Sequence, residues 1–173
     1  MHGMVSSKEW LPAVDALAGA AAQGDGLAML AAIDSLAYAS LTHTLCTINR
    51  YDAEAMRVVR LYSSNPAAYP PGGSKDKRGT DWGRHVLQEQ RVFVGEGADA
   101  IRQAFDDHAA IAALGLRSII NVPVVLRQTC LGTVNFLMRG EQVLPGQVGA
   151  ARLAALQAAT AFGLLGLQPA RPA

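Results

Sequence analysis

Two cysteines, Cys46 and Cys130, carry the most reactive side chains in this sequence. A thiolate acts as a nucleophile or a redox group when it lies in an accessible, electropositive setting. The cation nearest to Cys130 in the sequence is Arg127. Free cysteines also serve as small buried apolar residues. The pair is therefore compatible with thiol redox chemistry or with a structural role.

Histidines and acidic residues occur together at two places. His85 and Glu89 are four residues apart on a predicted helix, so they share one face. Asp106, Asp107 and His108 are consecutive, and their side chains cannot all point inward together. Because divalent metal sites need three or four convergent ligands, we expect no metal site. An imidazole next to a carboxylate is well suited to contact a ligand, which makes His108 a candidate binding residue.

The segment Gly72-Gly73-Ser74-Lys75 has the glycines and the lysine of a phosphate-binding loop. It lacks the complete G-x-x-x-x-G-K-[ST] spacing and no helix is predicted directly after it, so it does not indicate nucleotide hydrolysis. Backbone amides in this segment could still hold a carboxylate or a phosphate. The serines Ser63 and Ser64 have no identifiable base, so no Ser-His-Asp arrangement is predicted.

Two amides interrupt an otherwise apolar pair of predicted strands, Arg117 to Leu126 and Thr129 to Met138. Strands disfavour asparagine, yet Asn121 and Asn135 lie inside these two segments. A buried amide needs hydrogen-bond partners, and a ligand can supply them. The short polar step between the segments predicts a hairpin, which we expect to be central and covered on both faces.

Length and charge exclude several classes of function. The chain has 173 residues, a net charge of +1 and 17% charged residues, without a long run of one sign. A single domain with a sizeable core is expected at this length. Nucleic-acid binding through phosphate neutralisation would need a basic face, which the sequence does not indicate. The first residues do not form a signal segment, and with few cysteines we predict a cytoplasmic, reduced protein.

The segment from Val148 to Leu167 has about the length of a membrane-spanning helix. It consists mostly of alanine and glycine, and Arg152 within it would cost about 2.5 to 3.5 kcal/mol at the centre of a bilayer. We therefore predict a helix buried on two sides and no interaction with a membrane.

The other patterns predict a mixture of helices and strands. Apolar spacings of three and four predict helices at Lys8 to Ala22 and from Leu27 to about Tyr38. Alternation predicts strands at Leu41 to Asn49, Met56 to Tyr62 and Val92 to Val94. Further helices are expected after Thr80, after the capping residue Asp99, and from Ala109 to Leu114. This order predicts an α+β fold with an antiparallel sheet.

A long segment rich in proline and glycine, Ser63 to Gly79, separates the second strand from the helix after Thr80. Loops of this length in a compact domain are usually functional or disordered. Aromatic residues in and beside it favour packing, so we expect an ordered loop that folds back as a lid.

The hairpin pattern Asn-Val-Pro-Val, a short polar turn, and Leu-Gly-Thr-Val-Asn resembles the central hairpin of the GAF domain family. RLYSSNPAAYPPGGSK at Arg60 to Lys75, FDDH at Phe105 to His108 and LGLRSIINVPV at Leu114 to Val124 resemble small, stand-alone bacterial GAF proteins. The resemblance implies a central antiparallel sheet of five to six strands. It places the N- and C-terminal helices on one face, and short helices and loops over the other. Residues 27–167 would form the domain, 1–26 an N-terminal helical extension and 168–173 a tail.

The resemblance also implies a ligand site between the sheet and the loops and short helices of the middle region. Carried onto this sequence, the site would be formed by Tyr62, Ser64, Tyr69, Trp82, Phe105, Asp107, His108 and Asn121. The Asn-Lys-Phe…Asp-Glu pattern of cyclic-nucleotide-binding members is absent. Bilin-binding members have Cys followed by His, whereas Thr47 follows Cys46 and Leu131 follows Cys130. No cofactor is therefore expected.

Our leading interpretation is a sensor that binds a small polar or aromatic molecule under the lid. It would form a homodimer through its terminal helices and act on a separate effector protein. One alternative is a thiol redox enzyme of the free methionine-R-sulfoxide reductase type, with Cys46 and Cys130 on strands that are neighbours in the GAF fold. The other is an interaction subunit without a ligand.

Overall fold

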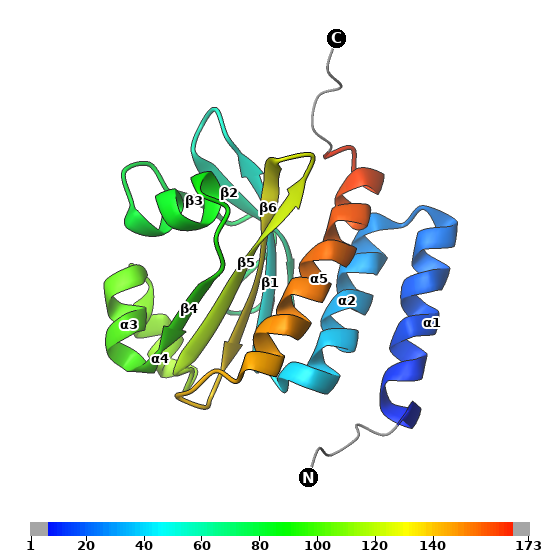
Figure 1. Cartoon of the computed structure of the whole chain (residues 1–173), viewed down its shortest axis with the longest axis horizontal. Helices are drawn as coiled ribbons and strands as arrows, with labels where there is room; N and C mark the ends of the chain where they lie inside the picture. The colour runs from blue at the N-terminus through cyan, green and yellow to red at the C-terminus, as the bar shows by residue number, and fades with distance from the viewer. Residues whose placement is uncertain (1–6, 168–173) are drawn as a thin grey trace.

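A six-stranded antiparallel sheet separates two layers of helices (Figure 1). The computed structural model describes residues 7–167, so the predicted tail at 168–173 lies outside the described residues. The strand order is β3-β2-β1-β6-β5-β4. The strands are β1 Leu45–Asp52, β2 Arg57–Ser63, β3 Ser74–Asp76, β4 Phe93–Glu96, β5 Ser118–Leu126 and β6 Thr129–Met138. The predicted α+β class and antiparallel sheet are confirmed.

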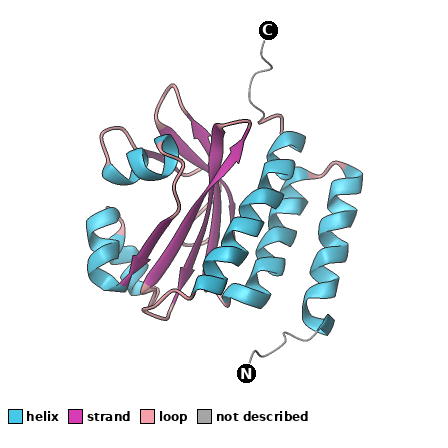
Figure 2. Cartoon of the chain, in the orientation of Figure 1, coloured by secondary structure: helices cyan, strands magenta, loops and turns pink. Residues whose placement is uncertain are grey.

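Three long helices cover one face of the sheet (Figure 2): α1 Ser7–Gln23, α2 Gly26–Leu41 and α5 Pro145–Leu164. Helices α2 and α5 lie against the sheet, and α1 packs on α2 as the outermost layer. Alanines on α5 are fully buried in this core, which allows close packing against the larger side chains of α2 and the sheet. Among residues 7–167, no helix has the length and apolar character needed to cross a bilayer.

The opposite face of the sheet carries three short helices: a π-helix η1 at Gly83–Gln88, α3 Gly97–Ala104 and α4 His108–Ala113. Their buried side chains form a second apolar core with the sheet, which includes Val86, Leu87, Ile101 and Ile111. The hydroxyl of Thr80 accepts a hydrogen bond from the backbone N–H of Gly83 at 3.0 Å, so the predicted capping role of Thr80 is confirmed. Asp99, predicted as a cap, lies instead in the first turn of α3.

The predicted central hairpin is confirmed as β5 and β6. Arg127 and Gln128 connect the strands with φ values of 49° and 62°, the left-handed backbone that a two-residue hairpin turn requires. Strand β6 pairs with β1 on its other side, which makes the hairpin interior to the sheet. Ile120, Val134 and Phe136 are fully buried against the long helices, as expected for strands covered on both faces.

The structure corrects two predicted boundaries. Strand β1 begins at Leu45 rather than Leu41, because α2 continues to Leu41 and ends at Thr42, whose φ is 48°. The backbone N–H of Thr42 still bonds to the carbonyl of Tyr38, so these residues cannot join the sheet. The segment predicted as an irregular loop contains β3, a short edge strand that pairs with β2.

A one-residue bulge changes the side on which β2 presents its side chains. Ile48 pairs with Tyr62 and Asn49 pairs with Arg60, so Leu61 is an extra residue on β2. A bulge of this kind breaks the alternation of side chains along a strand. Arg60 therefore points to the face with the short helices, whereas Tyr62 points to the long helices.

Candidate functional site

A cavity of about 70 Å³ lies between the sheet and the segment that carries β3, η1 and α4. The cavity is close to the sheet centre, where β1 and β6 meet β2 and β5. Its lining combines apolar, amide and charged side chains. The residues are Leu45, Thr47, Asn49, Val58, Arg60, Tyr69, Gly73, Lys75, Lys77, Trp82, Phe105, Asp107, Ile111, Ile119, Asn121, Asn135 and Leu137.

Aromatic side chains form one wall of the cavity. The rings of Trp82 and Phe105 meet edge to face with centroids 6.3 Å apart, and Phe93 packs on Phe105 in the same way at 5.8 Å. Trp82 and Phe105 are both buried. Such an arrangement holds each ring in a fixed orientation and offers a rigid apolar surface to a ligand.

A chain of hydrogen-bonded amides forms the floor of the cavity. The indole N–H of Trp82 donates to Oδ1 of Asn121 at 2.9 Å, and Nδ2 of Asn121 donates to Oδ1 of Asn135 at 2.7 Å. Nδ2 of Asn135 donates in turn to Thr47 and to the hydroxyl of Thr133, each at 3.2 Å. Protein groups therefore supply the hydrogen-bond partners of both buried amides. From the sequence alone, a ligand could also have been the partner. This network fixes the cavity floor before any ligand arrives.

Lys77 places an ammonium group inside this largely apolar site. It is 8% exposed, and its Nζ lies 4.6 Å from the centre of the Trp82 ring and 5.9 Å from that of Phe105. Within residues 7–167, no ion pair of Lys77 is found. Burial lowers the pKa of Lys77, and the neighbouring Lys75 lowers it further, whereas Asp107 acts in the opposite direction. The site thus holds a cation that the aromatic faces only partly stabilise.

Arg60 provides a second cation with unused hydrogen-bonding capacity. Its Nη1 donates to the carbonyl of Pro70 at 2.9 Å, and its guanidinium lies 5.1 Å from the ring centre of Tyr69. Its Nε is buried and has no hydrogen-bond partner in the described part of the chain. A buried donor without a partner is costly, and an anionic ligand would satisfy it.

Asp107 joins the segment at residues 63–79 to helix α4. Its carboxylate pairs with Nζ of Lys75 at 2.6 Å and accepts a hydrogen bond from the hydroxyl of Tyr69 at 3.2 Å. Burial alone would raise the pKa of Asp107, but the Lys75 ammonium and the hydrogen bonds outweigh it and lower the pKa. Burial and the Asp107 carboxylate raise the pKa of Tyr69 to about 12, so its phenol remains a donor near neutral pH. These contacts close one side of the cavity.

Asp107→Asn should remove an acid-sensitive part of the protein's stability. A carboxyl whose pKa is lowered in the folded state contributes stability above its unfolded value of about 3.9, and the contribution is lost as the pH falls below that value. Urea unfolding between about pH 5 and pH 3 should show a steeper loss for the natural protein than for the variant. The exposed neighbour Asp106, changed to Asn, serves as the control. Identical pH slopes for the natural protein and Asp107→Asn would contradict the assigned role.

The structure brings together Tyr69, Trp82, Phe105, Asp107 and Asn121, all of which were predicted from the sequence to form a binding site. The other predicted residues lie elsewhere. They are Tyr62, Ser64 and His108.

Each of these three residues is held away from the cavity by a local contact. Tyr62 points to the long helices because of the bulge at Leu61, and Ser64 is exposed and accepts a hydrogen bond from the backbone N–H of Cys46. Nδ1 of His108 contacts the carbonyl oxygen of Phe105 at 3.0 Å, at the start of α4. His108 is thus part of the turn before α4 and does not line the cavity.

Sequence reasoning missed the cationic side of the cavity, which is formed by Arg60, Lys75 and Lys77. Lys75 was noted only for its glycine-rich context, and its position on an edge strand gave no signal of which way it points. Asn135 was noted as an unusual strand residue, and its place beside Asn121 follows from the direct pairing of these residues in β5 and β6.

The two cysteines lie on opposite faces of the sheet. Cys46 is buried against the long helices, and Cys130 is buried in the core of the short helices. The prediction that their strands are neighbours is confirmed, since β1 pairs with β6. Cys46, however, pairs with Phe136, which is six residues from Cys130. At about 3.3 Å per residue, the two cysteines are roughly 20 Å apart along β6. A disulfide needs Cα atoms about 4.4 to 6.8 Å apart, so this fold does not allow one between them.

Neither cysteine is in the state that thiol chemistry requires. Burial raises the pKa of Cys130 to about 11, and burial together with the Asp34 carboxylate raises the pKa of Cys46. Both thiols are therefore protonated near neutral pH in the protein as described. The geometry does not support the redox alternative.

Comparison with solved structures identifies the fold. The GAF domain of a phosphoenolpyruvate-protein phosphotransferase from Coxiella burnetii superposes with a TM-score of 0.68 at 13% identity, over 93% of this chain and 97% of that chain. Residues 122 to 287 of a methyl-accepting chemotaxis protein give a TM-score of 0.67 at 18% identity, over 87% and 97% of the two chains.

A phycoerythrobilin-bound GAF domain from a cyanobacterial phytochrome is also similar, with a TM-score of 0.65 at 12% identity over 90% and 95% of the two chains. No family model and no curated relative matches the sequence. At these identities the similarity shows the fold, and the chemistry of the site must be argued from this chain's own residues.

Proposed function

Because the chain has the fold of GAF domains, we propose that it is a sensory module that binds a small anionic molecule in the cavity. The observation that carries this proposal is a pair of cations that line the cavity, the buried Lys77 and the half-buried Arg60. Lys77 has no ion pair among the described residues, and the buried Nε of Arg60 has no hydrogen-bond partner there. A third cation, Lys75, lies at the entrance and is paired with Asp107. The charged groups of the lining are thus three cations and one carboxylate.

Electrostatics favour a carboxylate or a phosphate as the recognised group. Removing a cation from water is costly, and an anion within hydrogen-bond distance offsets that cost most effectively where water is scarce. Arginine can present paired N–H donors to a planar anion, while lysine acts as a point charge. The walls formed by Trp82 and Phe105 would contact an apolar or planar remainder of the ligand.

Binding would be coupled to the segment at residues 63–79. An anion near Lys75 competes with Asp107, whose contacts with Lys75 and Tyr69 attach this segment to α4. The ligand would therefore change how the segment closes over the cavity, and a ligand-induced change must rest on such a difference in contacts. A separate effector protein would detect this change.

The proposal is tested with a panel of small carboxylates and phosphate esters, added to the purified protein and followed by native mass spectrometry and titration calorimetry. A one-to-one complex with at least one anion, weakened by salt and absent with neutral analogues, is the expected result. A protein that binds no anion in the panel but binds neutral analogues would contradict the anionic ligand. A protein that binds neither would favour the alternative of an interaction subunit with a filled interior.

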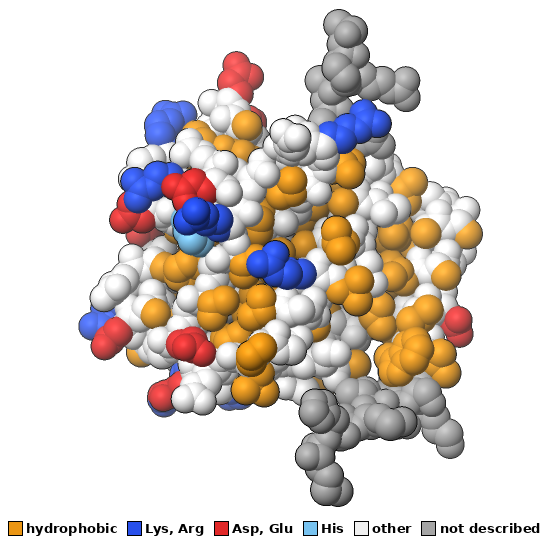
Figure 3. All heavy atoms as spheres, viewed as in Figure 1, with side chains coloured by type: hydrophobic (Ala, Val, Ile, Leu, Met, Phe, Trp, Pro, Cys, Tyr) orange, Lys and Arg blue, Asp and Glu red, His pale blue; other side chains and the backbone are white. Residues whose placement is uncertain are grey.

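We also propose that two copies associate through the outer helices. Exposed apolar side chains occur on α1 and α5, including Trp10, Leu11, Leu153 and Leu156. Hydrophobic side chains gather over this side of the molecule (Figure 3). A hollow lined by Trp10, Val14, Leu153 and residues of α2 runs between α1 and α5. Apolar patches of this kind are typical of protein interfaces.

Leu156→Glu should convert the dimer into a monomer, because it would place a charge among the exposed apolar side chains of α5. Leu156 is 68% exposed in the single chain, so the substitution should leave the fold intact. Light scattering over a range of protein concentrations measures the mass. Val94→Glu, at an exposed position of β4, is the control and should keep the dimer. A Leu156→Glu protein with the mass of the natural protein would show that α5 does not form the interface.

A further inference from the structure

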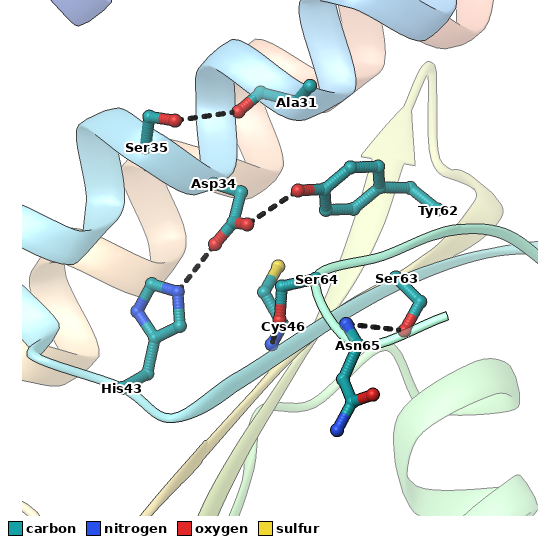
Figure 4. Close-up of polar contacts among 9 residues, drawn as sticks. All are labelled: Ala31, Asp34, Ser35, His43, Cys46, Tyr62, Ser63, Ser64 and Asn65. Carbon is teal, nitrogen blue, oxygen red and sulfur yellow. Dashed lines mark hydrogen bonds and ion pairs between the residues drawn. The ribbon is translucent and has the colours of Figure 1, made fainter. Parts of the chain in front are cut away.

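Four polar side chains converge on the other face of the sheet, between α2 and β1 (Figure 4). Oδ1 of Asp34 lies 2.5 Å from Nε2 of His43, and the hydroxyl of Tyr62 donates to Oδ2 of Asp34 at 2.6 Å. The sulfur of Cys46 completes the group. One ligand atom each from Asp34, His43 and Cys46 lie within 4.8 Å of one another. We call these four residues the Asp34 cluster.

Burial distinguishes the Asp34 cluster from a surface ion pair. Asp34 is 9% exposed, His43 is 5% exposed and Cys46 is fully buried. Nδ1 of His43 is buried and has no hydrogen-bond partner among the described residues. The contact with Asp34 is thus the hydrogen bond that orients this imidazole and places a ring proton on Nε2, while no bond holds Nδ1.

We propose that the Asp34 cluster binds a divalent ion of the zinc class, with the Asp34 carboxylate, His43 Nε2 and Cys46 Sγ as protein ligands. Carboxylate oxygen, imidazole nitrogen and thiolate sulfur are the ligands that zinc takes in proteins, in tetrahedral geometry. A thiolate disfavours magnesium and calcium, which take oxygen ligands. This site is independent of the cavity, which lies on the other face of the sheet.

The site requires a small rearrangement. Bonds of about 2.0 to 2.3 Å in a tetrahedron place ligand atoms about 3.3 to 3.6 Å apart. Asp34 and His43 must therefore separate by roughly 1 Å, and Cys46 must approach them. The thiol proton of Cys46 passes to solvent, and the ring proton of His43 moves from Nε2 to Nδ1. Binding thus releases one proton, and the ion replaces the hydrogen bond between Asp34 and His43.

Two neighbouring features fit the proposed ion. A hollow of about 360 Å³, lined by Asp34, Ser35, Tyr38, His43, Thr44 and Ser64, gives access to the carboxylate and the imidazole. It offers a route for the ion and room for a water molecule as fourth ligand. The hydroxyl of Tyr62 holds the second carboxylate oxygen of Asp34, which is how outer contacts orient metal ligands.

The test is a titration of untagged, chelator-treated protein with cobalt(II), which replaces zinc and reports its ligands by absorption. The natural protein should bind one equivalent, with the d–d bands of tetrahedral cobalt and a near-ultraviolet band from sulfur-to-cobalt charge transfer. Cys46→Ser should lose the charge-transfer band and bind at least about 100-fold more weakly, because losing a direct ligand should cost no less than losing an outer contact. The matched control Cys130→Ser removes the other buried thiol and should keep both the band and the affinity.

Further variants separate binding from folding. Tyr62→Phe should keep the charge-transfer band and bind roughly tenfold more weakly, because the orienting hydrogen bond is lost. His43→Gln, checked for folding by circular dichroism, should bind at least as weakly as Cys46→Ser. At the same zinc concentration, the melting temperature of the natural protein should rise by more than that of Cys46→Ser. The proposal would be overturned if the natural protein bound cobalt without the charge-transfer band. It would also be overturned if Cys46→Ser, or a folded His43→Gln protein, bound cobalt as tightly as the natural protein does.

Discussion

Gly132→Ala should lower the free energy of unfolding by about 3 kcal/mol. A Cβ atom at this position of β6 would lie 2.0 Å from the carbonyl oxygen of Asn49 and 2.6 Å from the ring of Phe162. Asn49 belongs to β1, which is paired with β6 along this stretch, so its carbonyl cannot move without disturbing the ladder. Phe162 is fully buried in the core formed with α5. The added methyl group is therefore pressed against both the sheet and the helix layer.

Urea unfolding followed by circular dichroism measures this effect. Gly149→Ala is the matched control, since a Cβ at this position of α5 meets no atom within 4 Å. Alanine is favoured over glycine in a helix, so the control should gain up to about 1 kcal/mol. The two substitutions add the same methyl group and should act with opposite signs. A Gly132→Ala protein as stable as the natural one would contradict the close contact of β1, β6 and α5.

Lys77→Met should weaken the binding of the anionic ligand about 100-fold while leaving the protein without ligand at least as stable as before. Methionine fills nearly the same volume against Trp82 and Phe105 but carries no charge. In the natural protein, burial removes part of the hydration of the Lys77 ammonium, and the rings of Trp82 and Phe105 are its neighbours in return. If Lys77 served stability alone, Lys77→Met would lower the free energy of unfolding and leave ligand binding unchanged.

The pH dependence of the free energy of unfolding provides a second test of the buried charge of Lys77. Since its pKa is lowered in the folded state, the unfolded chain holds the proton more tightly. The cost of burying the charge is complete below the folded pKa and is relieved as the pH rises through it toward the unfolded value of about 10.4. Lys77→Met should lack this rise in stability.

Calorimetry with the best anion of the panel and urea unfolding at several pH values measure both effects of Lys77→Met. Arg91→Met, which removes an exposed cation outside the cavity lining, is the control and should change binding little. Equal affinities of the natural protein and Lys77→Met would show that the ammonium does not contact the ligand. A marked loss of stability in Lys77→Met would instead assign Lys77 a structural role.

The parts of the fold that could be predicted are those with strong local patterns. The hairpin of β5 and β6 is a dense run of β-branched residues around a two-residue turn. The helix α5 was predicted from the alanine-rich composition of Val148 to Leu167, although it begins three residues earlier, at Pro145. The second helix was predicted too short because Leu41 opens an alternating pattern, Leu41 to Asn49, that is typical of a strand. What ends it is the left-handed backbone at Thr42, which no residue type demands.

The parts of the site that could not be predicted depend on pairing between distant segments. Alternation along β2 predicts that Arg60 and Tyr62 share a face, and the extra residue at Leu61 separates them. Lys75 lies in a Ser-Lys-Asp strand with weak strand propensity, which forms only because β2 offers a free edge. The aromatic residues of the site were placed by the resemblance to the GAF family, whereas Asn121 was singled out because an amide is unusual inside an apolar strand.

The Asp34 cluster could not be predicted from the sequence either, because it also depends on contacts between separate segments. Asp34 is one polar residue on an apolar helix, and His43 was expected on a strand that in fact begins two residues later. Their meeting depends on the turn at Thr42, which directs the chain back past the end of α2. Neither residue has a neighbour in sequence that would reveal the other.

The small volume of the cavity sets the timing of any response. A space of about 70 Å³ is well below the roughly 300 to 1,000 Å³ of ordinary ligand pockets. Under the proposed function, the bridge from Lys75 to Asp107 would therefore part before a metabolite enters. The observed association rate should then rise with ligand concentration only up to a ceiling, which is the rate at which the segment opens. A pulse of ligand shorter than the opening time would not lead to binding. A bound molecule would stay in the cavity after the ligand concentration in solution had fallen, because release would require the same opening.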